Sequence, residues 1–117
     1  MTHSQPAIDW KLTLTLCNGK ADLAEQLLTM LAEELPTHKK AIKNAYEKKQ
    51  FDVMANHVHK LLGASSYCGV PTLQEICLQL EIKLKTNKTT QLTDQLTLLY
   101  QAVDAIIHAH QKRNYSS

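Results

Sequence analysis

The chain has 117 residues, of which 44% are hydrophobic and 21% are charged, and this balance suits one soluble globular domain. Its net charge of +2 is too small to indicate a nucleic-acid-binding face, and no apolar stretch approaches membrane-spanning length. Aromatic residues make up only 5%, so we expect an aliphatic core, and the abundance of helix-forming residue types favours helices.

The cysteines and the N-terminus indicate the compartment. Cys17, Cys68 and Cys77 are odd in number and lack C-x-x-C spacing, which argues against a disulfide framework or a zinc site and fits a reducing environment. Residues 1–10 contain no apolar signal core. We therefore expect a cytoplasmic domain without membrane contact of its own, either free or as part of a longer, membrane-anchored protein.

Two helices are predicted in the first half of the chain, after a flexible lead at residues 1–7. Residues 8–17 form a short amphipathic segment, which an Asn-Gly pair then ends with a typical helix stop signal. A long helix starts near Ala21, and its apolar residues recur at helical spacing on both sides of Pro36. A mid-helix proline loses one hydrogen bond and tends to kink. We expect one long helix bent near Pro36, with a break there as the alternative.

Three more helices are predicted in the second half. Asp52 is expected to cap a helix that runs to about Cys68, where Gly69 suits a C-terminal cap. Thr72 is expected to cap the next helix, which a polar turn follows. The last helix is expected to end near His110.

The helix pattern predicts both the fold class and the domain organisation. Short connections between four substantial helices predict an all-α protein, an antiparallel up-and-down four-helix bundle. The short additional N-terminal helix would pack across one end. Residues 1–117 thus form one domain, with a flexible tail at residues 113–117.

His59 is the candidate functional residue because it projects from the outer face of its predicted helix. On a helix with about 100° per residue, the small residues Ala55, Gly63 and Ser66 share this face, opposite the apolar stripe. A mid-helix glycine costs about 1 kcal/mol relative to alanine, and bare backbone at Gly63 lets another protein approach the imidazole closely. The alternative, that Gly63 relieves a helix–helix contact, is disfavoured because Gly63 points away from the core.

Glu81 is expected to lie beside His59 on the neighbouring helix. Each of the two residues is eleven positions from Val70, the centre of the connection, so they lie at about the same height in an antiparallel pair. A carboxylate that binds one ring nitrogen fixes the tautomer and makes the other nitrogen a better nucleophile. The alternative is that Glu81 is an ordinary solvated charge.

The other histidines show no metal-binding pattern. Residues two apart on a helix point about 200° apart, so His57 cannot chelate a metal together with His59. We expect His57 to be a structural histidine nearer the core. His108 is expected to pair with Asp104, one turn earlier, and Trp10 is expected to anchor the first helix. The sequence therefore predicts no metal site.

The stretch that begins at His59 follows a family pattern: Gly63 comes four residues later, small residues follow, and Gly69 comes ten residues after the histidine. Together with Tyr-x-Gly-Val-Pro at residues 67–71 and Ile-Asp-Trp at residues 8–10, it resembles the histidine-containing phosphotransfer (HPt) domains of bacterial phosphorelays. The similarity covers nearly the whole chain and is to the C-terminal HPt domains of BarA/GacS-type hybrid sensor kinases.

The resemblance implies roles for individual residues. His59 would be phosphorylated at Nε2, and Glu81 matches the family position, often Gln, that hydrogen-bonds the other ring nitrogen. Many members have a lysine three residues after the histidine, where this chain has Leu62. Lys60 is the nearest cation in sequence and the candidate for charge support. The expected docking face comprises Ala55, Leu62, Gly63 and Ser66.

The resemblance also implies a function, that of a phosphorelay intermediate. A receiver-domain aspartate of a hybrid kinase would donate a phosphoryl group to His59, which would pass it to the aspartate of a response regulator. The domain would be a monomeric carrier and not an enzyme, without an ATP site or a bound cofactor, and Mg²⁺ would lie on the receiver. The alternative is a helical adaptor that binds receiver domains without transfer, which Leu62 in place of lysine favours.

Overall fold

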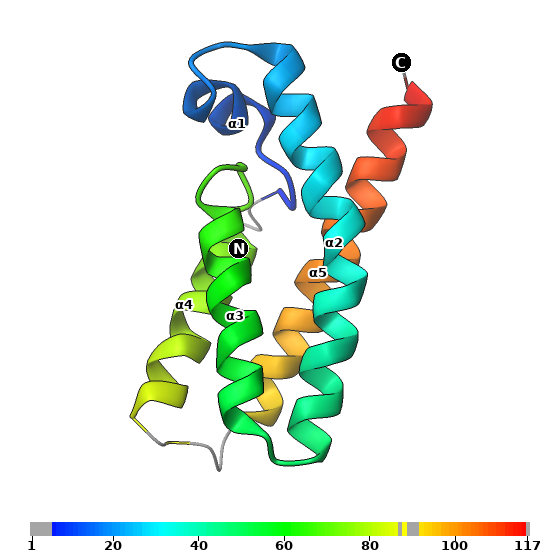
Figure 1. Ribbon diagram of the computed structural model, residues 1–117. Helices are drawn as coiled ribbons and strands as arrows, with labels where there is room; N and C mark the ends of the chain where they lie inside the picture. The colour runs from blue at the N-terminus through cyan, green and yellow to red at the C-terminus, as the bar shows by residue number, and fades with distance from the viewer. Residues whose placement is uncertain (1–5, 87, 89–91, 117) are drawn as a thin grey trace, which may run out of the picture.

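The computed structural model describes residues 6–86, 88 and 92–116, with side chains up to residue 113. The rest of the expected lead and tail, residues 1–5 and 117, lies outside the described residues. Five α-helices and no strand occur in the described part of the chain (Figure 1). None of these helices is long and apolar enough to cross a membrane. They are α1 (Trp10–Leu16), α2 (Ala21–Glu47), α3 (Phe51–Ser65), α4 (Pro71–Lys85) and α5 (Thr93–Ser116).

Helices α2 to α5 run alternately up and down and form the predicted antiparallel four-helix bundle (Figure 1). Each helix packs against the next one in the chain, and α5 closes the bundle by packing against α2. The short helix α1 lies across the end at which α3 connects to α4. Because α3 and α4 are neighbours, side chains from these two helices can meet on the outer surface of the bundle.

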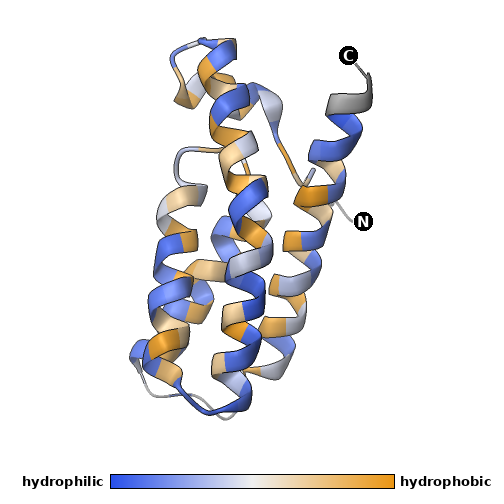
Figure 2. Cartoon of the chain, turned by 45° about the vertical axis from the view of Figure 1, so that its right-hand side comes forward, coloured by the Kyte–Doolittle hydropathy of each residue, from blue (hydrophilic) through white to orange (hydrophobic). Residues whose placement is uncertain are grey.

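The core is aliphatic, as the composition predicted, and hydrophobic and hydrophilic residues alternate along each helix of the bundle (Figure 2). Burial of one large apolar side chain contributes about 1.5–3 kcal/mol. On α3 the inward positions include Met54 and Val58, which leaves His59 on the outer surface. The largest fully buried side chains include Leu28, Leu35, Ile42, Met54, Leu61, Leu73, Leu80, Leu92, Leu99 and Ile106.

Helix α1 lies within the predicted segment, and α2 is one long helix, as predicted, without the alternative break at Pro36. After α1, Asn18 adopts the left-handed conformation with φ 56°, and the Gly19 amide donates a hydrogen bond to the Leu14 carbonyl at 2.7 Å. This arrangement satisfies carbonyl groups that the end of a helix leaves without partners. Helix α2 runs without interruption through Pro36, which is exposed. The hydrogen bond lost at Pro36 therefore does not end the helix.

The starts of α3 and α4 differ from the predicted ones. Helix α3 already includes Phe51, and the Asp52 carboxylate accepts a hydrogen bond from the adjacent Val53 amide at 3.0 Å. Helix α4 begins with Pro71, because the first position of a helix does not need the N–H that proline lacks. Asp52 and Thr72 thus lie inside their helices, and their predicted roles as N-caps were wrong.

Gly69 does not cap α3, which ends at Ser65, but joins the α3–α4 connection to α1. Its carbonyl accepts a hydrogen bond from the Asp9 amide at 2.6 Å, and its amide donates to Thr13 Oγ1 at 2.9 Å. Thr13 Oγ1 in turn donates to the Asp9 carbonyl at 2.8 Å. A Cβ atom at Gly69 would lie 2.3 Å from that carbonyl oxygen. Only glycine therefore allows α1 to approach this closely.

Helix α5 extends beyond its predicted end to Ser116, so residues 113–116, expected to form a flexible tail, are helical. Near this end the guanidinium carbon of Arg113 lies 4.1 Å from the centre of the Trp10 ring. Arg113 also forms an ion pair with Glu25 on α2. Trp10 thus anchors α1 to the bundle, as predicted, through a cation–π contact with α5.

Candidate functional site

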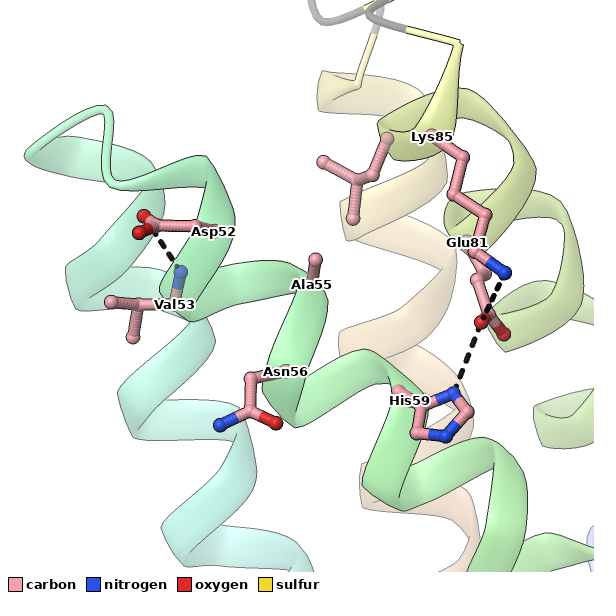
Figure 3. Close-up of a pocket in the computed structure, with 8 residues that line it drawn as sticks. Asp52, Val53, Ala55, Asn56, His59, Glu81 and Lys85 are labelled. Atoms are coloured by element: carbon pink, nitrogen blue, oxygen red, sulfur yellow. Dashed lines mark hydrogen bonds and ion pairs between the residues drawn. The ribbon is translucent and has the colours of Figure 1, made fainter.

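His59 lies on the outer surface of α3, and its side chain is 73% exposed. Its Nδ1 atom lies 3.0 Å from Oε1 of Glu81 on α4 (Figure 3). The Glu81 side chain is only 12% exposed, so the bundle holds its carboxylate in place. The structure therefore brings together the two residues that the symmetry of the α3–α4 connection predicted to be neighbours.

The contact with Glu81 determines which nitrogen of His59 is available for chemistry. An ionised carboxylate can only accept hydrogen bonds, so Nδ1 of His59 carries the hydrogen and donates it to Glu81. The second ring nitrogen, Nε2, lies on the side of the ring away from Glu81 (Figure 3). In the neutral imidazole Nε2 keeps its lone pair. The site thus presents a nucleophile in one fixed tautomer.

Lys85 is a further member of this site, which the sequence analysis missed. Its Nζ atom lies 3.1 Å from Glu81 Oε1, the same oxygen that His59 contacts (Figure 3). The hydrogen bond from His59, followed by the one from Lys85, lowers the pKa of the Glu81 carboxyl below its ordinary value. The spacing of Glu81 and Lys85, four residues apart on one helix, could have indicated this pair.

Lys60, the cation expected to support the site, is not among the residues that contact His59 or Glu81. The pKa of His38 on α2 is lowered by burial, then by the charge of His57, and further by the charge of Lys60. Successive residues of a helix point about 100° apart, so Lys60 leaves α3 in another direction than His59, which contacts α4. The structure therefore places Lys85, and not Lys60, in contact with the His59–Glu81 pair.

A surface hollow of about 650 Å³ lies beside His59 and Glu81. It continues from His59 toward the start of α3 and the end of α4, and it combines charged, polar and apolar side chains. Of the expected docking residues, Ala55 lines this hollow, whereas Leu62, Gly63 and Ser66 follow His59 on α3 and do not line it. The lining residues are Asp52, Val53, Ala55, Asn56, His59, Glu81, Leu84 and Lys85.

Gly63 is exposed, and a Cβ atom at this position would meet no other atom within 4 Å. Packing between helices therefore does not require a glycine here, which removes that alternative. Leu62 is half-buried against the core, and its carbonyl accepts a hydrogen bond from the Ser66 hydroxyl at 3.1 Å. One turn after His59, the backbone of α3 is thus open to the surface at Gly63.

Known proteins identify the family of this chain. The family model of the Hpt domain matches residues 26–109, a range that contains His59, Glu81 and Lys85. The chain belongs to the Hpt domain family. The crystal structure of the HPT domain from a sensor hybrid histidine kinase of Shewanella is 32% identical in sequence and superposes with a TM-score of 0.89, over 95% of this chain and 96% of that one.

Curated relatives of this HPt domain are much longer proteins. Sensor protein GacS of Pseudomonas syringae pv. syringae is 39% identical over 86 residues, which are 73% of this chain and 10% of the relative. The signal transduction histidine-protein kinase BarA of Escherichia coli is 29% identical over 107 residues, 91% of this chain and 12% of the relative. The chain thus spans about a tenth of the length of these relatives. By its family it is a histidine phosphotransfer domain of two-component signalling.

Other histidines of the HPt domain hold its helices together. The Nδ1 atoms of His57 on α3 and His38 on α2 lie 3.0 Å apart. His57 is thus structural, as predicted, but its partner His38 lies on another helix and was not foreseen. Asp104 accepts hydrogen bonds from Lys39 Nζ at 2.9 and 3.1 Å and does not pair with His108, contrary to the prediction. Among the described residues, no three metal-binding side chains converge.

Proposed function

We propose that this HPt domain is a phosphorelay intermediate that accepts a phosphoryl group on Nε2 of His59. The observation that carries the proposal is the hydrogen bond from His59 Nδ1 to Glu81, 3.0 Å long, on an exposed surface of the bundle. It leaves the lone pair of a neutral imidazole at Nε2, where a protein partner can reach it. The donor is a phosphorylated aspartate of a receiver domain, and the acceptor is the aspartate of a response regulator.

The first transfer needs a nucleophile in line with the bond that breaks. The Nε2 lone pair of His59 attacks phosphorus, the Nε2–phosphorus bond forms, and the bond to the aspartate oxygen breaks with its electron pair leaving on the carboxylate. The imidazole gains positive charge, which the Glu81 carboxylate stabilises through the Nδ1 hydrogen. In the second transfer an aspartate oxygen of the response regulator attacks the same phosphorus atom, and the Nε2–phosphorus bond breaks with its electron pair returning to the imidazole. The receiver brings Mg²⁺ in both steps.

The donor in this proposal is the receiver domain of a hybrid sensor kinase. The similarity to an HPT domain from a sensor hybrid histidine kinase of Shewanella supports this choice. The relative GacS is itself named a sensor protein. We place the domain as a monomer in the cytoplasm, where it works alone or as part of a longer protein anchored in the inner membrane.

A transfer assay with a phosphorylated receiver domain tests the proposal. The wild-type domain should gain the mass of one phosphoryl group, and acid should remove it, because a phosphorus–nitrogen bond is acid-labile. His59→Gln should gain none while it keeps the circular dichroism spectrum and the receiver affinity of the wild type, since His59 is exposed and outside the core.

Either of two results would contradict the proposal. If His59→Gln gained as much phosphoryl group as the wild type, the phosphorylated residue would have to be a residue other than His59. Binding of receiver domains without any gain of mass on the wild type would replace the carrier with a non-transferring adaptor. Reverting Leu62 to lysine would then be the first change to make, because that position carries a cation in many HPt domains.

A further inference from the structure

We propose that the positive charge of Lys85 compensates the negative charge of Glu81. Glu81 can then hold the His59 imidazole by a hydrogen bond without repelling the phosphoryl group that binds to the imidazole. This inference rests on the proposed function of His59. It assigns a charge-compensating role to Lys85, in addition to the roles of His59 as nucleophile and Glu81 as its hydrogen-bond partner. It concerns the rate of phosphorylation at His59, and its test can fail while phosphotransfer itself stands.

A single carboxylate oxygen connects the three residues. Oε1 of Glu81 accepts a hydrogen bond from His59 Nδ1 at 3.0 Å and another from Lys85 Nζ at 3.1 Å (Figure 3). The two nitrogen atoms therefore lie no farther apart than these two distances together. All three side chains line the same surface hollow. Lys85 thus brings its positive charge into the same hollow, next to the Glu81 carboxylate that holds the imidazole.

The charges at this site create a conflict that a cation resolves. The lowered pKa of Glu81 means that its carboxylate is ionised at neutral pH. Its negative charge attracts the imidazolium that forms during transfer but repels the phosphoryl oxygens. The ammonium of Lys85 on the same oxygen offsets the repulsion and leaves the hydrogen bond to His59 in place.

The exposure of Lys85 fits this role. Its side chain is 72% exposed, whereas Glu81 is held against the bundle. The long lysine side chain can therefore hold its ammonium on the Glu81 carboxylate at the surface without any rearrangement of the core. Because the side chain lies outside the core, substitution of Lys85 should leave the fold intact.

Phosphoramidate is the probe that isolates this effect, since it is a small phosphoryl donor and brings no receiver charges to the site. Nε2 of His59 attacks phosphorus, the phosphorus–nitrogen bond of the donor breaks, and ammonia leaves with the electron pair. The Nδ1 hydrogen stays between the imidazole and Glu81. His59→Gln gives the background from other histidines, and the initial rate of His59 phosphorylation is measured by intact mass in the presence of phosphoramidate.

Four variants decide the question. Lys85→Met should slow phosphorylation about fivefold, the size expected for the loss of one partly exposed charge contact. Lys85→Arg should keep the rate within about twofold of the wild type, because the cation is retained. The double variant Glu81→Gln/Lys85→Met should be faster than Lys85→Met, since a neutral amide still binds Nδ1 but does not repel phosphate. Lys40→Met, an equal change of charge at an exposed position of α2, should react at the wild-type rate.

Two outcomes would overturn the inference. One is an unchanged rate in Lys85→Met. The other is a double variant that is as slow as Lys85→Met or slower, which would show that the carboxylate charge does not oppose the reaction. If the wild type took up no phosphoryl group from either phosphoramidate or a receiver, the proposed function itself would fail.

A second measurement needs no phosphate. The titration of the Glu81 side chain, followed by NMR, should move to higher pH in Lys85→Met, because Lys85 contributes to the lowered pKa of that carboxyl. Lys40→Met should leave the titration in place. An unmoved Glu81 pKa in Lys85→Met would show that the ion pair is absent in solution and would overturn the inference as well.

Discussion

Gly63 lies one turn beyond His59 on α3, and nothing in the bundle requires a glycine there. A glycine inside a helix costs about 1 kcal/mol relative to alanine. The chain therefore gives up stability at an exposed position one turn from the exposed imidazole. This cost has a reason if a receiver domain must come close to the backbone beside His59.

Gly63→Leu tests this explanation. The variant should keep the bundle but slow transfer from a phosphorylated receiver about tenfold, because a large side chain at the docking face obstructs the approach of the partner. Phosphorylation by phosphoramidate should stay at the wild-type rate, since a small donor does not need that space. Transfer from the receiver at full rate would remove the docking role of Gly63.

Glu81 and Lys85, the two residues that form the site with His59, differed in how well they could be predicted. Glu81 followed from counting residues on either side of the α3–α4 connection, since antiparallel geometry fixes which positions face each other. Lys85 was not predicted because Lys60 is the cation nearest to His59 in the sequence. The side chain that matters comes from the neighbouring helix, four residues after Glu81.

Among the elements, α1 depends on Gly69 for its place on the bundle. The Asp9 amide, the Thr13 hydroxyl and both backbone groups of Gly69 form a closed set of hydrogen bonds between α1 and the α3–α4 connection. No space remains for a side chain at Gly69, where an added Cβ would lie 2.3 Å from a backbone oxygen. The same connection sets the register of α3 against α4, and with it the height of His59 relative to Glu81.

Gly69→Ala should therefore destabilise the domain by about 1–3 kcal/mol, the usual cost of forcing atoms into a filled site. The measurement is the free energy of unfolding in urea. Gly63→Ala is the matched control, and it should stabilise the domain by about 1 kcal/mol because alanine favours the helix and meets no neighbour. Equal effects of the two substitutions would contradict the close contact between α1 and the connection.

The helices themselves could be predicted, but their ends and their contacts could not be read fully from the sequence. Asp52 and Thr72 are residue types that cap helices well, yet each lies one position inside a helix that starts without a side-chain cap. Gly69 was assigned to a helix end because glycine is common there. Its real role depends on α1, which arrives from a distant part of the sequence, and no local pattern reveals such a contact.

For the whole molecule, the His38–His57 contact predicts how stability depends on pH. The pKa of His38 lies below its ordinary value of 6.5, because of burial first and then the charges of His57 and Lys60 on α3, while Glu34 on α2 acts in the opposite direction. The unfolded chain therefore binds the proton first as the pH falls. This contribution to stability is fully present above pH 6.5 and is lost as the pH falls through the folded-state pKa.

Urea unfolding between pH 7.5 and 5 would measure this loss, with buffers of about equal ionic strength. In His38→Gln the free energy of unfolding should decrease less steeply as the pH falls. In His108→Gln, a change at an exposed histidine, it should decrease as in the wild type. This pH range is separate from the range in which Glu81 acts. The lowered pKa of Glu81 contributes stability that is lost only below pH 4.5, the ordinary pKa of a glutamate carboxyl. An identical slope in His38→Gln and the wild type would contradict the prediction.

The exposure of His59 has a consequence for the order of events in a relay. Only one nitrogen of the imidazole is held, Nδ1 by Glu81. In the proposed relay Nε2 is therefore the single atom through which each phosphoryl group enters and leaves. Two receiver domains cannot occupy the space around one atom together. Donor and acceptor must therefore exchange places in a ping-pong sequence, and an excess of unphosphorylated acceptor would compete with the donor and slow the first half of the cycle.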